Sequence, residues 1–206
     1  MRSISIVFMV IPFFAFNQNT INQELQGRIY KMYQMDQECR GQLRSYLNHE
    51  LDTNEYKRTT IERRILEVDS INSAEIRKIT ETIGFPGYDR VDTNYSDAFW
   101  NLVQHQDKQV ELQREVLKKM KIEVDRKNAS FLYYAYLVDR VNINTGEKQV
   151  YGTQMQLNSD STSYEPKPVI EPEQLNRRRQ EAGLVPIEAY IKMMNDRYRG
   201  TLKEEE

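Results

Sequence analysis

Apolar side chains recur every three or four residues from Leu25 to Leu43, which is the spacing of one face of an α-helix. This pattern predicts one long helix over residues 20–51. The chain has only 8 glycines and 6 prolines among its 206 residues, about half of their average share, so few positions interrupt helices. A chain of this length suits one domain. The sequence therefore predicts a mainly α fold, a single-domain helical bundle.

The middle of the chain divides into further helical segments. One helix is predicted over residues 54–69 and a second over residues 73–83, with Ser73 as its N-cap. Residues 84–96 contain two glycines and a proline and are predicted to form a loop. The last serine of that loop is then expected to cap a long helix over residues 97–125.

The C-terminal half begins with an ambiguous segment. The aromatic residues of 128–139 favour a strand, whereas its alanine and leucines behind a capping residue favour a helix, and a short helix is our prediction. Residues 141–143 and 149–151 flank Asn144-Thr145-Gly146-Glu147, which predicts one short β-hairpin. Two more helices are expected to begin at Pro172 and Pro186.

The first residues have the composition of an export signal. The run from Ile4 to Phe16 has no charged residue, and about 13 residues are too few to cross the ~30 Å core of a bilayer as a helix. We expect a signal peptide over residues 1–17, a single helical domain over 18–200 and a charged tail over 201–206. An uncleaved membrane anchor is the alternative. The mature protein is thus expected to be exported, periplasmic or extracellular, with no stable membrane anchor.

The charge balance narrows the classes of partner and cofactor. Lys and Arg number 29 against 31 Asp and Glu, so the net charge is −2, and no global positive field attracts nucleic acid or an anionic membrane. The single cysteine, Cys39, excludes an intramolecular disulfide, and two histidines argue against a histidine-rich metal site. We therefore predict no nucleic acid partner, no metal and no cofactor.

One acidic residue interrupts the apolar face of the first predicted helix. At 100° per residue, Asp36 lies about 20° from Leu25, inside the arc of apolar side chains. Arg40 follows one turn later and can pair with Asp36. The two form either a surface pair on a partly covered helix or a half-buried pair with a function, because burial of an unpaired carboxylate is costly.

The helix predicted over residues 97–125 carries a polar strip on its apolar half. On a helical wheel the strip contains His105 with Gln106, Gln109 and Gln113. These groups either form a closed network that fixes helix packing or line a ligand pocket. Asp107 falls toward the solvent side of the same wheel, so any acidic partner of His105 is expected to come from another segment.

Three consecutive arginines, Arg177 to Arg179, are predicted to lie within a helix. Steps of 100° cannot turn all three the same way, so at least one is expected to point inward if the helix packs. The three form either a solvated basic face or a clamp for a carboxylate or phosphate.

Many of these residues fall in short motifs that follow one another along most of residues 30–190. The motifs are Asp36-Gln37 with Arg40; Gly84-Phe85-Pro86; Trp100 with Gln104, His105, Asp107 and, downstream, Gln113; Asp139-Arg140-Val141; Gln149 with Tyr151-Gly152-Thr153-Gln154; and Asn176 with Arg178-Arg179 and Gly183-Leu184. In these motifs the chain resembles a bacterial domain family of unknown function found in exported and cytoplasmic proteins. Phe85 stands where the family has tryptophan. The resemblance implies no activity, but its motifs contain most of the polar residues that periodicity singles out.

Two hypotheses of different class account for these residues. In the first, a pocket lies between the helices predicted over residues 20–51 and 97–125, covered by residues 84–96 and 149–154, and binds a small anionic ligand. His105 acts there as general base or acid, oriented by Asp36 or Asp139. The ligand-binding residues are expected to be Arg40, Gln104, Gln113, Arg140, Tyr151, Gln154 and Arg178.

The second hypothesis is a non-catalytic interaction or structural module. The buried polar residues then only specify the fold, and residues 177–179 and the tyrosine-rich segment 130–136 contact a protein partner. The two hypotheses differ in whether the polar residues surround an open cavity or fill a closed core.

Overall fold

The computed structural model describes residues 21–49, 51 and 57–204. The predicted signal peptide over residues 1–17 lies outside the described residues. Within them the fold is mainly α, with one two-stranded antiparallel sheet, which confirms the predicted fold class. In chain order the elements are α1 Gln23–Leu47, α2 Arg58–Ile83, α3 Tyr88–Gln104, α4 Val110–Asp125, α5 Phe131–Asn144, β1 Met155–Leu157, β2 Tyr164–Pro166, a 3₁₀ turn Pro172–Gln174, α6 Leu175–Glu181 and α7 Ile187–Glu204.

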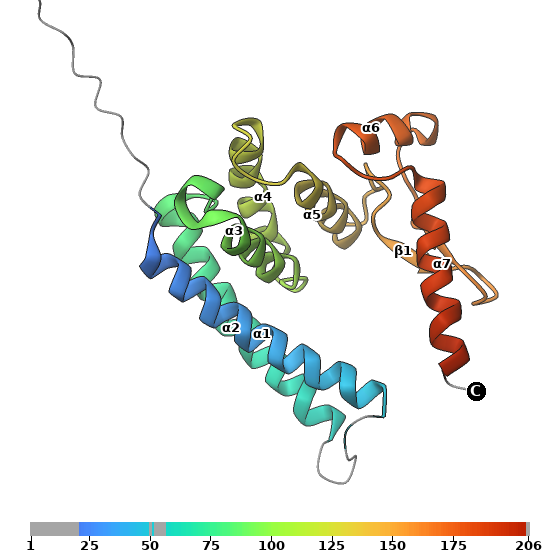
Figure 1. Ribbon diagram of the computed structural model, residues 1–206, viewed down its shortest axis with the longest axis horizontal. Coiled ribbons are helices and arrows are strands. Elements are labelled where there is room, and N and C mark those ends of the chain that lie inside the picture. The colour runs from blue at the N-terminus through green and yellow to red at the C-terminus, as the bar shows by residue number, and fades with distance from the viewer. Residues whose placement is uncertain (1–20, 50, 52–56, 205–206) are drawn as a thin grey trace, which may run out of the picture.

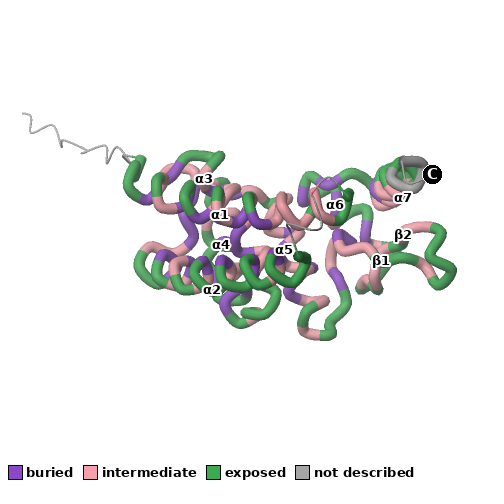
Figure 2. Tube along the Cα trace, turned by 90° about the horizontal axis from the view of Figure 1, so that it is seen from below, coloured by how far each residue is buried: buried purple, intermediate pink, exposed green. Residues whose placement is uncertain are grey.

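The long helices α1 and α2 lie side by side as an antiparallel hairpin, and α3 and α4 pack against one end of it (Figure 1). Helix α5 packs on α4 and leads to the last part of the chain, where α7 contacts β2. The largest core joins α1 to α5, with Ile29, Ile76, Phe99, Leu112 and Leu137 among its fully buried side chains. Figure 2 shows this core as the buried segments on the facing sides of the helices. No helix in the described ranges has both the length and the apolar character needed to cross a bilayer.

Helix α2 is continuous, so the prediction of two separate helices over residues 54–69 and 73–83 is wrong: one helix spans both segments from Arg58 onward. Ser73 lies inside the helix, and its hydroxyl donates to the carbonyl of Ser70 instead of capping a new N-terminus. The helix ends at Gly84 as the glycine predicts, with a φ of 80° that favours glycine.

The next two boundaries also differ from prediction. Residues 84–96 are not a loop, because α3 begins at Tyr88 and continues through a kink at Asp92, where φ is 69°. The helix predicted over 97–125 is broken between Gln104 and Val110. The amide of Gln113 donates to the carbonyls of residues 103 and 104, so a side chain from α4 adds hydrogen bonds to carbonyls at the end of α3.

The C-terminal half contains one confirmed helix and one misplaced hairpin. Ser130 caps α5 through its hydroxyl, which accepts from the Tyr133 amide, so the predicted short helix is confirmed. The hairpin predicted around residues 144–147 is wrong: Gly146, with φ of 79°, follows the end of α5 instead of turning between strands. The observed hairpin pairs Met155 with Pro166 and Leu157 with Tyr164. The helices expected after Pro172 and Pro186 are present, and α7 runs to Glu204, into the predicted tail.

Candidate functional site

Asp36 is fully buried, on the inner face of α1. Its carboxylate accepts three kinds of hydrogen bond: from Arg40 Nε at 2.8 Å, from Gln37 Nε2 at 2.9 Å and from His105 Nδ1, which lies 3.0 and 2.9 Å from the two oxygens. Burial by itself would raise the pKa of Asp36, but His105 and Arg40 together outweigh it and lower the pKa below its ordinary value. The carboxylate is therefore ionised at neutral pH and only accepts hydrogen bonds.

His105 is the C-cap residue of α3, at the start of the break between α3 and α4. Because Asp36 only accepts, the ring nitrogen Nδ1 has to carry a proton, and in the neutral ring Nε2 then holds the free lone pair. No hydrogen bond to Nε2 is present within the described residues. The imidazole is 18% exposed, so the carboxylate orients a ring that solvent can reach.

Arg40 joins this pair to α2. Its Nη2 lies 2.5 Å from Asp69 Oδ1, while Nε contacts Asp36. Burial raises the pKa of Asp69, and the positive charge of Arg40 opposes that shift. The guanidinium thus bridges two carboxylates from different helices, which is the geometry that its planar fork of donors favours.

A cavity of about 380 Å³ lies beside these groups. We name it the His105 cavity; it is lined by Arg40 of α1, by Leu66, Asp69, Ser70 and Ser73 of α2, and by residues 105–109 of the break. Gln106 is buried, yet its Nε2 has no hydrogen bond partner. A buried amide nitrogen without a partner is costly, and Gln106 is the lining residue of this cavity that has one.

The predicted covering of this pocket is not the observed one. Residues 84–96 and 149–154 do not line the His105 cavity; α2 and the break between α3 and α4 do. The expectation was wrong because it assumed a continuous helix over residues 97–125. The chain is not helical between Gln104 and Val110, so a helical wheel does not give the relative directions of side chains on the two sides of the break.

Arg140 has a partner other than a ligand. Its Nε and Nη2 donate to the two oxygens of Asp107 at 2.7 and 2.6 Å, and Asn144 donates to the same carboxylate. Burial tends to raise the pKa of Asp107, but these donors lower it. The three residues tie the break to α5. Gln113 is fully buried, and its amide nitrogen donates to Asp107 and to the backbone carbonyls of Val103 and Gln104.

Asp139 is equally buried but lies in a different network. Its oxygens accept from the backbone amides of Val150, Tyr151 and Thr153 at 2.7 to 2.9 Å, and from the Thr153 hydroxyl. Burial raises the pKa of Asp139, and these hydrogen bonds oppose the shift. His105 is not among its partners. Gln154 and Tyr151 also belong to this segment: Gln154 exchanges hydrogen bonds with Gln149, and burial raises the pKa of Tyr151 to about 12.

Two of the three arginines of α6 donate hydrogen bonds to backbone carbonyls of residues 150–152. Arg178 donates to the carbonyls of Val150, Ile170 and Glu171. Arg179, almost fully buried, is the arginine that points inward; it donates to Val185, Tyr151 and Gly152 and lies 5.0 Å from the ring centre of Tyr190. These contacts are to backbone carbonyls and an aromatic ring, so neither guanidinium is directed at the His105 cavity.

The structure therefore brings His105, Asp36 and Arg40 together, and places Asp139, Tyr151, Gln154 and Arg178 in a second network. Sequence reasoning missed Asp69, because the predicted helix ended there and gave that residue no inner face. It noted Gln106 only as part of the polar strip. The available signal for Asp69 was its position one residue after the apolar Val68 in an unbroken helix. Within the described residues, no three acidic, histidine or cysteine side chains could together hold a metal ion.

Comparison with known proteins gives a family and no further relative. The model of a family of unknown function, DUF6624, matches residues 23–203. The chain belongs to this family. The match agrees with the expectation of an uncharacterised domain family. The matched residues of this DUF6624 domain include both polar networks. No curated protein and no solved structure is similar enough to match.

Proposed function

We propose that the chain is an enzyme of the general acid/base type, with His105 as the proton acceptor and a substrate in the His105 cavity. The observation that carries the proposal is the contact between His105 Nδ1 and the buried Asp36. The other ring nitrogen, Nε2, has no hydrogen bond within the described residues, and His105 lines the cavity. A carboxylate that holds one ring nitrogen while the other faces a substrate is a common arrangement for a histidine base.

The proton transfers follow from this arrangement. Nε2 removes a proton from a water molecule as its oxygen attacks an electrophilic carbon or phosphorus of the substrate. The imidazolium that results is stabilised by Asp36, whose lowered pKa keeps it ionised. The same Nε2 proton then passes to the leaving group, which departs with the electron pair of the broken bond. Asp36 and Arg40 act as positioning residues in this scheme.

The substrate class follows from the charges around the cavity. Arg40 is paired with Asp36 and Asp69, and Arg140 with Asp107, so these arginines meet an anionic ligand only in competition with carboxylates. Lys108 and the unpartnered amide of Gln106 also line the cavity. They suit a neutral ester or amide whose oxygen becomes negative during attack. The small anionic ligand expected from the sequence is the second candidate, favoured by Lys108.

The test uses two chromogenic esters, p-nitrophenyl acetate and p-nitrophenyl phosphate, which differ in charge. We expect hydrolysis of the neutral ester, and a loss of about 100-fold or more in His105→Gln. His49→Gln is the matched control, because His49 is exposed and outside the cavity. Asp36→Asn should lower the rate and move its pH profile. Equal rates in wild type and His105→Gln would leave the non-catalytic interaction module as the better description, and faster hydrolysis of the phosphate would favour an anionic substrate.

Export is a separate proposal, supported by the uncharged run from Ile4 to Phe16. N-terminal mass spectrometry of secreted protein should find a start between Phe16 and Asn19. Intact Met1 in a membrane fraction would instead indicate an anchor.

A further inference from the structure

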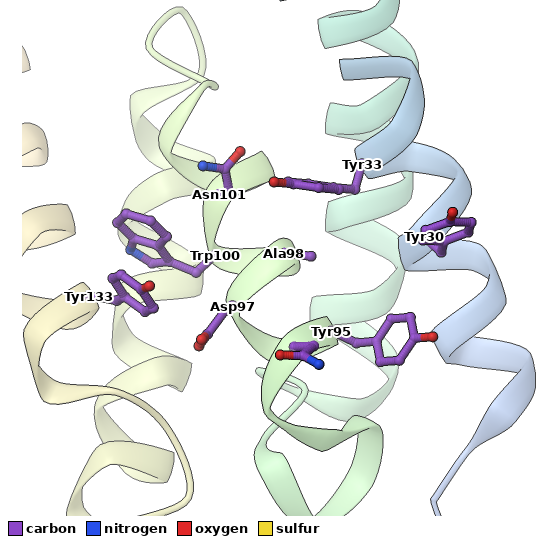
Figure 3. A pocket seen from close by; sticks show the side chains of 9 residues that line it. Tyr30, Tyr33, Tyr95, Asp97, Ala98, Trp100, Asn101 and Tyr133 are labelled. Carbon is purple, nitrogen blue, oxygen red and sulfur yellow. The ribbon is translucent and has the colours of Figure 1, made fainter. Parts of the chain in front are cut away.

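A second cavity, of about 440 Å³, lies between α1, α3 and α5. We name it the aromatic cavity, because four tyrosines and Trp100 line it together with one carboxylate, two asparagines and an alanine. In the view of Figure 3, Trp100 and Tyr133 lie on one side, Tyr30 and Tyr95 on the other, and Asp97 between them. It shares no lining residue with the His105 cavity.

The carboxylate of Asp97 has no compensating partner in the part of the chain that the structure describes. No hydrogen bond or ion pair to Asp97 is present within the described residues, and none of the described residues that line the cavity is cationic. Burial raises the pKa of this group, which reflects the cost of holding a charge away from water. All other carboxylates that we describe at the sites have arginine, histidine or backbone donors.

The aromatic rings that line the cavity also favour a positively charged ligand. Trp100 and Tyr133, which both line the cavity, stack with ring centres 4.3 Å apart, so each ring covers one face of the other and keeps its second face outside this stack. The faces of such rings carry partial negative charge and attract cations. A cavity lined by aromatic rings and by a carboxylate without a partner in the described residues is therefore complementary to positive charge spread over an apolar surface.

We propose that the aromatic cavity binds a small organic cation, of the substituted ammonium class. The ammonium group lies near Asp97, and its alkyl substituents contact the tyrosine and tryptophan rings. A carbohydrate also stacks on aromatic rings, but a neutral sugar would leave the charge of Asp97 uncompensated, so the observations favour the cation.

The chain supplies its own reporter for the test. Trp100 is the single tryptophan in the sequence and lines the aromatic cavity, so its fluorescence reports on this site. We expect a saturable change on titration with choline, against a sodium chloride control. The neutral isostere 3,3-dimethylbutan-1-ol should bind roughly tenfold more weakly or worse, which corresponds to about 1.4 kcal/mol.

Two variants separate charge from ring contacts. Asp97→Asn should weaken choline about tenfold, and Glu111→Gln, which removes an exposed acid of α4 outside the cavity, should leave it unchanged. Tyr95→Leu, with circular dichroism to verify folding, should also weaken binding. The absence of a saturable change, equal binding of the neutral isostere, or binding of cellobiose in place of choline would each overturn the proposal. Because ester hydrolysis is measured separately, these outcomes do not depend on the fate of His105.

Discussion

Asp36 and Asp139 are both fully buried carboxylates, yet their donors are of different kinds. Asp36 accepts from an imidazole, a guanidinium and an amide side chain beside a cavity. Asp139 accepts from three backbone amides and a hydroxyl within residues 150–153. The first set contains groups that can exchange protons or be displaced, whereas the second fixes the path of the chain. Burial of a charge is thus common to both regions, and the nature of the donors distinguishes a candidate site from a structural anchor.

The largest effect is expected for Asp139→Asn. The new amide nitrogen replaces an oxygen that accepts from backbone amides, which only donate, and the substitution removes the negative charge, so we expect a loss of about 4 kcal/mol in the free energy of unfolding, measured by urea denaturation. Asp125→Asn, at an exposed position, is the control and should change stability by less than about 0.5 kcal/mol. A small loss for Asp139→Asn would remove the distinction between the two carboxylates.

The second effect is expected for Arg40→Ala, which leaves Asp36 buried with fewer donors. We expect a loss of about 3 kcal/mol at pH 7, whereas Arg58→Ala, which breaks an exposed pair with Glu62 of the same i,i+4 spacing, should lose less than about 1 kcal/mol. Unchanged thermal unfolding of Arg40→Ala would contradict this assignment.

The loss in Arg40→Ala should also depend on pH. Because the pKa of Asp36 in the folded chain is below its ordinary value of 3.8, its ionised form stabilises the fold above about pH 4. That contribution disappears as pH falls through the folded pKa. Urea denaturation at decreasing pH should therefore find the difference between wild type and Arg40→Ala smaller in acid than at neutral pH.

The smallest effect on stability is expected for His105→Gln. A glutamine amide can also donate to Asp36, and the imidazole is already in contact with solvent, so the loss should be below about 1 kcal/mol. His49→Gln serves as the exposed control in the same denaturation series. A loss of several kcal/mol would mean that His105 supports the fold in the way that the donors of Asp139 do.

The helical fold could be predicted because apolar spacing and the scarcity of glycine and proline are local features. The acidic partner of His105 was expected from another segment, and the two candidates were Asp36 and Asp139. The sequence could not choose between them, because the choice depends on which residues fold back to supply donors. Asp139 receives its donors from residues that begin eleven positions downstream, where a hairpin was predicted.

The break between α3 and α4 could not be predicted from the sequence for a related reason. Residues 105–109 contain no glycine or proline, so nothing local ends the helix. Contacts from other elements hold the break, through Arg140 on Asp107 and Gln113 on the last carbonyls of α3. The same break presents His105 and Gln106 to the cavity, so the least predictable segment contains the candidate base.

Gln37 connects the two cavities. Its single amide nitrogen donates to Asp36 Oδ2 and to Asn101 Oδ1, and Asn101 lines the aromatic cavity. A ligand that drew Asn101 away from this amide would alter the hydrogen bonding of the carboxylate that orients His105. Thermodynamic reciprocity then requires that occupancy of the His105 cavity change the affinity of the aromatic cavity by the same factor. If both proposed ligands bind, the Gln37 side chain is the direct hydrogen-bonded link through which one could influence the other.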